Sequence, residues 1–423
     1  MSIVDLKTSR RRFLAGSGVA AASTVALNVR KPRLAFATPG DPSRGDAIVV
    51  VYLRFGADGL SMAPPIGSAY DSYRALRPTE FITPDQALPL DSSNPNAAFP
   101  QGLSGTIGLH PKFTGLYNSV WASGQLAVLP ASGMPDHESD SRSHFQAQWN
   151  MEIGAANPDI RSGWLTRVMA GQAPSAPVGG VTTTSSAPTI FRGSVDSFSV
   201  ANLSSFGLAG FRNTDAAVGA INLLHQGSPQ INQLGRATLS GASALGTVDS
   251  GGGSGYPAGN FGADLRDVAN ILRADVGLTT ALIDFPAGWD YHSNQGTLGG
   301  RFDNQIVGLD AGLTAFIADL GDAFNETTIM VISEFGRTID ENASGGTDHG
   351  RGGTTLIMGG GIQGGVFGYD YPDVIEDTDQ NRRALPVLTD YRKAFDEVVR
   401  ARVGVTGSFP TLAEGIPDLG LVR

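Results

Sequence analysis

The segment Asp46–Phe55 places the strongest limit on how this chain can fold. It reads Asp-Ala-Ile-Val-Val-Val-Tyr-Leu-Arg-Phe and lacks the polar alternation of a strand with one solvated face. A continuous apolar run of this length is typical of a parallel-sheet strand that is covered on both faces. Because parallel strands need crossover connections, we expect further strands to alternate with helices along the chain.

The rest of the sequence shows this alternation. Continuous apolar segments predict strands at 125–130, 280–285, 327–332 and 354–358. Apolar residues at helical spacing predict helices at 111–123, 264–276, 302–320 and 390–403. The pattern favours an α/β fold with a mainly parallel central sheet and helices on both faces.

The amino terminus has the features of a twin-arginine signal peptide. Residues 9–14 read Ser-Arg-Arg-Arg-Phe-Leu, a weakly apolar run extends over 14–29, and Ala-Phe-Ala at 35–37 offers a cleavage site. The alternative is a disordered basic tail. We expect residues 1–37 to direct export in folded form by the twin-arginine translocase. Residues 38–423 would then form a single periplasmic or secreted domain with no stable membrane span.

Composition excludes several classes of site and partner. The net charge of −10 argues against nucleic acid as a partner. The chain has no cysteine, which excludes disulfides, cysteine zinc sites and thiol nucleophiles. Residues 226–262 are rich in glycine and serine and predict a flexible loop or insertion within the domain, since polar motifs lie on both sides of it.

Polar motifs lie next to the ends of the predicted strands, where sites form in open α/β sheets. The motifs are Asp58, Asp136-His137-Glu138, Ser141-Arg142-Ser143-His144-Phe145, Asp290-Tyr291-His292, Ser333-Glu334-Phe335-Gly336-Arg337-Thr338 and Gly346-Thr347-Asp348-His349-Gly350. Imidazoles suit zinc and manganese, whereas carboxylates suit magnesium, calcium and manganese. These motifs therefore predict a divalent metal site at one edge of the sheet.

Each motif also has a purely structural interpretation. Asp58 lies in a glycine-rich turn, Asp290 could cap a turn, and Glu334 could pair with a neighbouring arginine. Ser143 could cap a helix that begins at the next residue. The arginines near the motifs could neutralise the carboxylates or bind an anionic substrate group: Arg54, Arg142, Arg337 and Arg351. His110 and His225 lie outside the motifs and favour structural roles.

One bacterial family is resembled by four motifs together: Asp-Gly-Leu at 58–60, Arg-Ser-His-Phe at 142–145, Ser-Glu-Phe-Gly-Arg-Thr at 333–338 and Gly-Thr-Asp-His-Gly at 346–350. It is the twin-arginine-exported domain-of-unknown-function 1501 family, which looks like a divergent branch of the alkaline phosphatase and sulfatase superfamily. The resemblance implies an alkaline phosphatase-like fold. It also implies metal ligands at Asp58, Asp290, His292, Glu334, Asp348 and His349, with Glu334 either a substitute ligand or a residue that positions Arg337.

The resemblance implies a nucleophile and an anion-binding group as well. The superfamily's cysteine or serine nucleophile motif is absent at a comparable position, which leaves Ser143 as the first candidate and Ser141 as the second. Arg142 would bind the anion, and His144 and Arg337 complete the expected catalytic set.

We therefore expect an exported metal-dependent hydrolase of phosphate or sulfate esters, acting on an anionic small-molecule or glycan ester. The alternative is a non-catalytic relative that binds a glycan or a protein outside the cytoplasm. The missing nucleophile motif favours the alternative, and the Asp-His-Gly motif favours the enzyme.

Overall fold

The computed structural model describes residues 46–423 except 136–137, 140, 173–176, 195, 208–213, 228, 286–287, 372–382 and 414. Its centre is a nine-stranded sheet with the order β10-β4-β9-β8-β1-β7-β5-β6, and β11 also pairs with β4. The strands are β1 (Ala47–Tyr52), β4 (Leu126–Gly133), β5 (Gly180–Thr182), β6 (Ser197–Ser199), β7 (Thr280–Asp284), β8 (Thr327–Ile332), β9 (Gly353–Gly359), β10 (Gly365–Val366) and β11 (Thr389–Asp390). A separate antiparallel pair joins β2 (Leu88–Pro89) to β3 (Gly108–Leu109).

The strands of the large sheet run parallel with one exception. Strand β9 pairs antiparallel with both β4 and β8. The other described pairs of this sheet are parallel. The predicted α/β fold with a mainly parallel central sheet is therefore confirmed.

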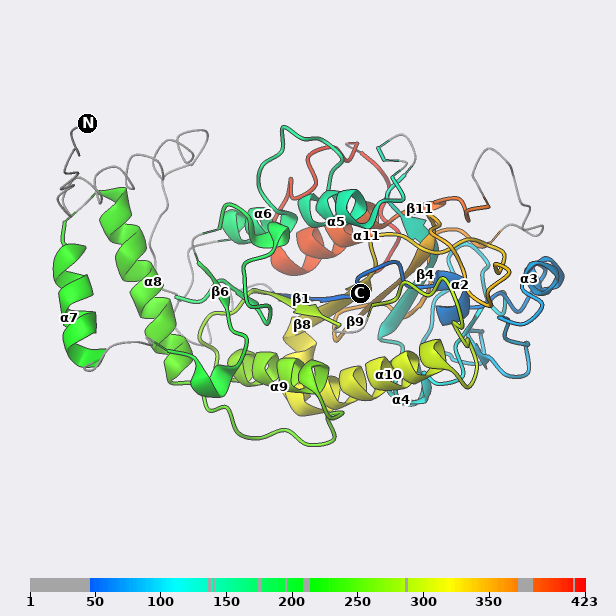
Figure 1. The fold of residues 1–423 in the computed structure, drawn as a ribbon, viewed down its shortest axis with the longest axis horizontal. Coiled ribbons are helices and arrows are strands. Elements are labelled where there is room, and N and C mark those ends of the chain that lie inside the picture. Colours follow the sequence, from blue (N-terminus) through cyan, green and yellow to red (C-terminus); the bar gives the residue numbers. More distant parts are fainter. Residues whose placement is uncertain are drawn as a thin grey trace, which may run out of the picture.

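Helices cover both faces of this sheet (Figure 1). One face carries α5 (His144–Ile153), α6 (Trp164–Gly171) and α11 (Tyr391–Val398), and the other carries α4 (Thr114–Leu116), α9 (Asn260–Arg273) and α10 (Arg301–Leu320). A π-helical turn extends α4 over Tyr117–Trp121 and another extends α11 over Val399–Val403. Shorter helices are α2 (Gly59–Met62), α3 (Tyr70–Leu76) and the 3-10 turns at Thr189–Phe191, Leu203–Ser205 and Gly321–Glu326.

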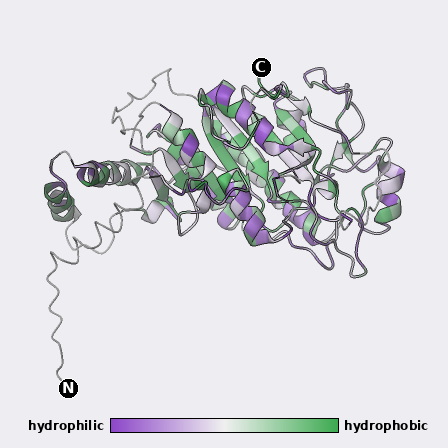
Figure 2. Ribbon diagram, turned by 90° about the horizontal axis from the view of Figure 1, so that it is seen from above, coloured by the Kyte–Doolittle hydropathy of each residue, from purple (hydrophilic) through white to green (hydrophobic). Residues whose placement is uncertain are grey.

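Two hydrophobic cores, one on each face of the sheet, explain the unbroken apolar sequence of β1. Val49 and Val51 pack into the core that contains α9 and α10. Ile48 and Val50 pack into the core beneath α5, α6 and α11. Since side chains alternate along a strand, both sets of positions must be apolar when both faces are covered. Figure 2 shows the same feature as apolar colour on the central strands.

Helices α7 (Thr214–Leu224) and α8 (Gln230–Gly246) lie at one end of the molecule (Figures 1 and 2). The prediction of a flexible loop over 226–262 is wrong for residues 230–246, which form α8, and for the start of α9. Leu245 is fully buried and Leu239 nearly so. Burial of these leucines compensates for the weak helix propensity of the surrounding glycines and serines.

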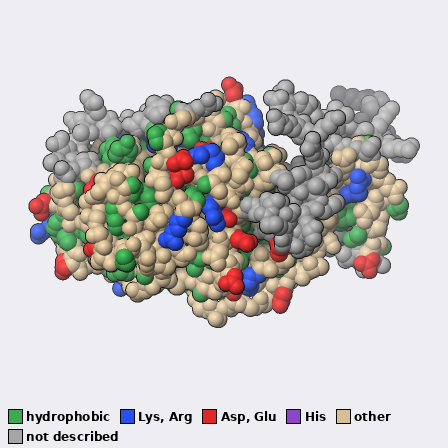
Figure 3. Space-filling model, turned by 180° about the vertical axis from the view of Figure 1, so that it is seen from behind, with side chains coloured by type: hydrophobic (Ala, Val, Ile, Leu, Met, Phe, Trp, Pro, Cys, Tyr) green, Lys and Arg blue, Asp and Glu red, His purple; other side chains and the backbone are tan. Residues whose placement is uncertain are grey.

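The surface and the termini add two observations. On the face shown in Figure 3, acidic and basic side chains are interspersed rather than separated by sign. No helix in the described part of the chain is long and apolar enough to cross a membrane. The predicted signal peptide at 1–37 lies outside the described residues.

Candidate metal centre

The sheet topology brings four polar side chains to one edge. Asp290 follows β7, Glu334 follows β8, and His144 begins α5, the first helix after β4. These three strands run parallel, so their carboxyl ends share that edge. His349 precedes β9, and because β9 runs the opposite way its amino end lies at the same edge.

Two glycines let the Ser-Glu-Phe-Gly-Arg-Thr and Asp-His-Gly segments meet. Arg337 and His349 form an isolated antiparallel bridge between them. A Cβ on Gly350 would collide with the carbonyl oxygen of Arg337, and a Cβ on Gly336 would collide with that of Gly352. Glycine at both positions is therefore required for the backbone approach that carries His349 to the site.

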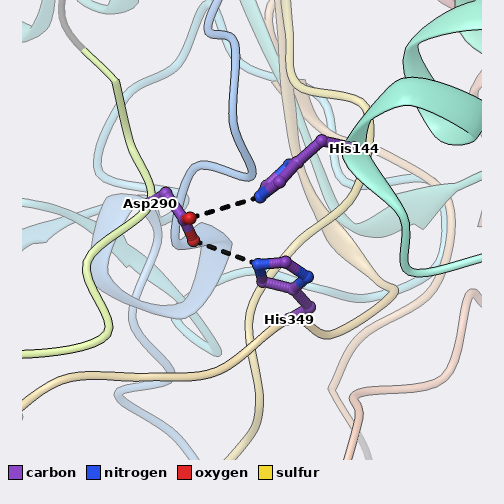
Figure 4. A group of neighbouring side chains, drawn as sticks. All are labelled: His144, Asp290 and His349. Atoms are coloured by element: carbon purple, nitrogen blue, oxygen red, sulfur yellow. Dashed lines mark hydrogen bonds and ion pairs between the residues drawn. The ribbon is translucent and has the colours of Figure 1, made fainter.

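His144, Asp290 and His349 form a group that could hold a metal ion (Figure 4). One ligand atom from each lies within 4.8 Å of the others. The two carboxylate oxygens of Asp290 face the two imidazoles, with Nε2 of His349 at 3.1 Å and Nε2 of His144 at 3.4 Å. Two nitrogens and one oxygen with a side open to solvent match the ligand set of a catalytic zinc site.

His292 adds a third imidazole beside this group. Its Nε2 lies 3.0 Å from Oδ1 of Asp290 and 3.1 Å from Nε2 of His349. Two ring nitrogens at that distance can share only one proton between them. At least one of the two therefore presents a lone pair toward the centre.

All three imidazoles are oriented from behind by a hydrogen bond to Nδ1. The pairs are His144 with Glu334 at 2.8 Å, His292 with Asp348 at 2.7 Å, and His349 with the backbone carbonyl of Arg142 at 2.8 Å. Carbonyl and carboxylate oxygens accept, so each Nδ1 carries the proton; the tautomers follow from these partners. In a neutral ring, Nε2 is then the unprotonated, metal-binding nitrogen.

Glu334 acts as a buried acceptor rather than an open ligand. Its carboxylate accepts from the backbone N–H of Phe55 at 2.9 and 3.2 Å and from the side-chain amide of Gln148 at 3.2 Å. The hydroxyl of Ser333 donates to it at 3.2 Å. Together with Nδ1 of His144, these donors hold the carboxylate in one position behind the imidazole ring.

Burial and neighbouring charges shift the pKa values of Asp290, His349 and Asp348. Burial alone would raise the pKa of Asp290, but the Arg337 guanidinium at 2.7 Å and the nearby imidazoles lower it overall. Burial lowers the pKa of His349, the hydrogen bond to the Arg142 carbonyl opposes this shift, and the Arg337 guanidinium adds to it. For Asp348, hydrogen bonds from His292 and Asn342 outweigh burial and lower the pKa. Deprotonated ligands are the form that binds metal.

Nε2 of His144 is the strongest sign that this group binds an ion. It is buried and has no hydrogen-bond partner among the described residues. The His144 ring is stacked on the Phe335 ring, with centroids 4.9 Å apart. It also makes a T-shaped contact with the Phe55 ring. A buried imidazole nitrogen without a partner is costly unless an ion or water binds it. The nitrogen-rich ligand set fits zinc or manganese better than calcium.

The structure does not bring Asp58, a predicted ligand, into this group. Its carboxylate is buried and accepts two hydrogen bonds from Arg77, at 2.6 and 3.0 Å, and one from Gln295 at 2.7 Å. Burial would raise its pKa, but the charge and hydrogen bonds of Arg77 lower it. The guanidinium thus supplies the positive charge that the sequence analysis assigned to a metal ion.

The predicted roles of four further residues differ from the geometry. Glu334 and Asp348, predicted as ligands, contact Nδ1 atoms behind the group instead of joining it. His144, predicted to be catalytic, is a member of the group. Arg337, also predicted to be catalytic, has a fully buried side chain and holds Asp290 while donating to the carbonyl of Thr347.

The remaining predicted residues lie at the start of α5. Nη1 of Arg142 donates to the carbonyl of His349 at 3.2 Å, which places the guanidinium beside the site. Ser143 is the exposed N-cap residue of α5, and its hydroxyl makes no capping hydrogen bond. Its backbone N–H donates to the hydroxyl of Ser141 at 3.2 Å. Asp136 and His137 lie outside the described residues.

Sequence reasoning missed Arg77 and Gln295, which contact Asp58, and the contact of Phe55 with His144. Arg77 follows α3 in an irregular segment, so neither strand order nor motif spacing indicated its partner. Phe55 is the last residue of the apolar run that predicts β1, so the sequence indicated a strand residue and gave no sign of its contact with His144.

Comparison with known proteins supports the family resemblance. Residues 262–385 match the family model described as protein of unknown function DUF1501, a segment that contains Asp290, Glu334 and His349. The resemblance is thus confirmed over that segment. A search of the curated proteins finds no match.

Several solved structures are distantly similar. The C-terminal periplasmic domain of EcEptC from Escherichia coli, in complex with Zn, has 11% identity and a TM-score of 0.36, covering 92% of this chain and 96% of that chain. A mutant of TAB5 alkaline phosphatase with Mg bound has 10% identity and a TM-score of 0.31, covering 74% and 91%. Ps i-CgsB in complex with k-i-k-neocarrahexaose has 10% identity and a TM-score of 0.33, covering 86% and 72%. At these scores the similarities do not indicate what the site does.

Proposed function

We propose that this chain is an exported hydrolase of phosphate or sulfate esters that uses one divalent metal ion, zinc or manganese. His144, His349 and Asp290 would hold the ion, with His292 beside them as a fourth donor. The observation that carries the proposal is the shared orientation of the imidazoles. Each has Nδ1 bonded to an acceptor, and Nε2 points toward one carboxylate.

The side chains around the ion would have distinct tasks. Arg337 fixes Oδ1 of Asp290 from the protein side and leaves the second oxygen directed at His144. Glu334 and Asp348 hold two of the imidazoles in place, which preorganises the ligand set. A bound divalent cation would polarise the ester and lower the pKa of a water molecule.

An anionic substrate is supported by the position of Arg142. Its guanidinium lies beside His349, on a segment that also carries the exposed hydroxyl of Ser143. Arginine binds phosphate and sulfate oxygens through two parallel hydrogen bonds. In this proposal Arg142 holds the anion while the Ser143 hydroxyl attacks phosphorus or sulfur, loses its proton and displaces the alcohol of the ester. Water would then hydrolyse the serine ester, which releases phosphate or sulfate and restores the hydroxyl.

Metal analysis tests the centre directly. Protein purified without chelator is expected to contain about one equivalent of divalent metal. His349→Ala and His144→Ala should lose it, whereas His225→Ala, which alters a histidine on the distant α7–α8 connection, should not. Metal content that stays the same in both ligand variants would refute the site.

Turnover tests the reaction. Phosphomonoesters, phosphodiesters and sulfate esters should be screened with zinc, manganese, magnesium and calcium. The expected result is metal-dependent hydrolysis of one class, reduced in Arg142→Ala and Ser143→Ala. An unchanged rate in Ser143→Ala would remove the serine from the mechanism while leaving the metal centre intact.

A second candidate is a non-catalytic module that binds a glycan or a protein. The observation in its favour is the buried Asp58–Arg77 pair, because it neutralises a carboxylate that the superfamily resemblance assigns to a metal ion. Metal bound at one equivalent without turnover of any ester class would favour this candidate.

Export by the twin-arginine translocase, with a periplasmic or secreted location, is part of the proposal. It is supported by the order of arginines, apolar run and small-residue site within residues 1–37. Replacing Arg10 and Arg11 by lysine should retain the protein in the cytoplasm, as measured by cell fractionation. Normal export of that variant would contradict the assignment.

A further inference from the structure

Phe55 has a backbone conformation that is unusual for an aromatic residue. Its φ is 78°, and the next residue, Gly56, has a φ of 70°. Two successive positive φ angles are typical of a tight turn in which asparagine or glycine is preferred. For a bulky side chain such a conformation is a steric outlier, because Cβ crowds the backbone.

Hydrogen bonds to residues of the proposed metal centre hold the Phe55 backbone in this conformation. The N–H of Phe55 donates to both oxygens of Glu334, the carboxylate that orients His144. Two residues further along the chain, the N–H of Ala57 donates to the hydroxyl of Ser333 at 2.9 Å. The turn therefore cannot relax without breaking hydrogen bonds to the buried carboxylate.

The Phe55 side chain stays partly exposed in this strained position. The residue is 37% exposed, and its ring meets that of His144 edge to face, with centroids 5.3 Å apart. A glycine at this position would keep the N–H bonds and avoid the steric cost. Strain that is retained at a solvent-facing residue beside a ligand group indicates a function for the side chain.

We propose that Phe55 is a specificity-determining residue that packs against an aromatic ring in the organic group of the substrate, next to the metal centre. This inference rests on the proposed function. An exposed phenyl face adjoining an anion site selects aryl esters over esters with small organic groups, since ring–ring contact adds to the binding of the anion.

The experiment measures binding, so it does not depend on turnover. Phenylphosphonate and methylphosphonate are titrated by calorimetry into the zinc-loaded full chain, with zinc content determined for each variant. The wild type is expected to bind phenylphosphonate about tenfold more tightly than methylphosphonate. Phe55→Gly, which suits the positive φ, should lose the preference while affinity for methylphosphonate changes by less than about twofold. Phe55→Tyr should keep the preference.

The outcomes separate this inference from the proposed function. Equal affinity of the wild type for both phosphonates, or a preference that survives in Phe55→Gly, would overturn the role of Phe55 alone. Loss of zinc from Phe55→Gly would also overturn it, because the residue would then act through Glu334 and His144. Failure of both phosphonates to bind protein that holds one zinc ion per chain would overturn the anion site and this inference with it.

Discussion

Replacing Glu334 by glutamine separates a residue that orients a ligand from one that binds the metal itself. The Glu334 side chain is fully buried and accepts from Nδ1 of His144 at 2.8 Å. A glutamine has nearly the same shape, and its carbonyl oxygen can still accept that hydrogen bond. The variant therefore keeps the His144 tautomer but loses the negative charge behind the ring.

The expected loss follows from the geometry. Substitutions of residues that hold a metal-binding histidine from behind typically weaken metal binding by about 10–100-fold. Glu334→Gln should lie near the lower limit, a loss of about 1.4 kcal/mol in binding free energy. Glu334→Ala should lie near the upper limit, about 2.7 kcal/mol, because it removes the acceptor as well as the charge.

The assay is a zinc titration in competition with a chelating dye, paired with thermal unfolding with and without zinc. Zinc at 100 times its Kd stabilises the folded protein by about 2.7 kcal/mol, and a tenfold weaker site should lose about half of that stabilisation. Glu341→Gln is a suitable control, since its carboxylate accepts from the backbone N–H of Thr79 instead of a ligand. Equal, complete loss of zinc in Glu334→Gln and Glu334→Ala would show that the carboxylate is a direct ligand, and unchanged affinity in both would refute the orienting role.

Three further predictions address the centre and its surroundings. His349→Ala should abolish the zinc-dependent rise in melting temperature, whereas His225→Ala should retain it. The reverse result would show that the metal binds elsewhere. Arg77→Met should lower the free energy of unfolding by about 3–5 kcal/mol in urea titrations, because it leaves the buried carboxylate of Asp58 without its partner. The zinc content per folded chain of Arg77→Met should equal that of the wild type, and adding Asp58→Asn should restore part of the stability. Loss of zinc would instead indicate that Asp58 is a metal ligand. Burial raises the pKa of Asp264 to about 7, whereas an aspartate in the unfolded chain has a pKa of about 3.9. Between these two pH values the folded protein therefore keeps a proton on Asp264 that the unfolded chain releases. The contribution of this carboxyl to stability should therefore fall as pH rises from about 4 to about 7. Asp264→Asn should gain stability relative to the wild type when the pH is raised from 5 to 8. If the urea midpoints of variant and wild type differ by the same amount at both pH values, the shift is contradicted.

The sequence predicted which edge of the sheet carries the polar motifs, and the reason is topological. Parallel strands end at one edge, so residues that follow β7 and β8 meet there regardless of their separation in the chain. The segment before β9 reaches the same edge because β9 runs in the opposite direction. The apolar run of β9 predicted a strand but carried no information about its direction.

The roles of individual residues at that edge could not be predicted in the same way. Spacing indicates that His144 and Glu334 come near each other, but only coordinates show which ring nitrogen meets the carboxylate. Likewise, the pairing of Asp58 with Arg77 depends on an irregular segment whose path no periodic pattern describes. Helix α8 was missed for a related reason: burial of Leu245 determines it, and composition alone predicted a loop.

The balance of charge around the site favours one metal ion over two. A pair of metal ions requires several carboxylates that are free to bridge or coordinate them. Here Asp58 is neutralised by Arg77, and Glu334 and Asp348 are engaged by imidazole Nδ1 atoms. Asp290 shares its Oδ1 with Arg337, which leaves Oδ2 as the acidic ligand atom directed at His144. With His144, His349 and one carboxylate in the group and His292 beside it, the described residues there offer ligands for a single cation.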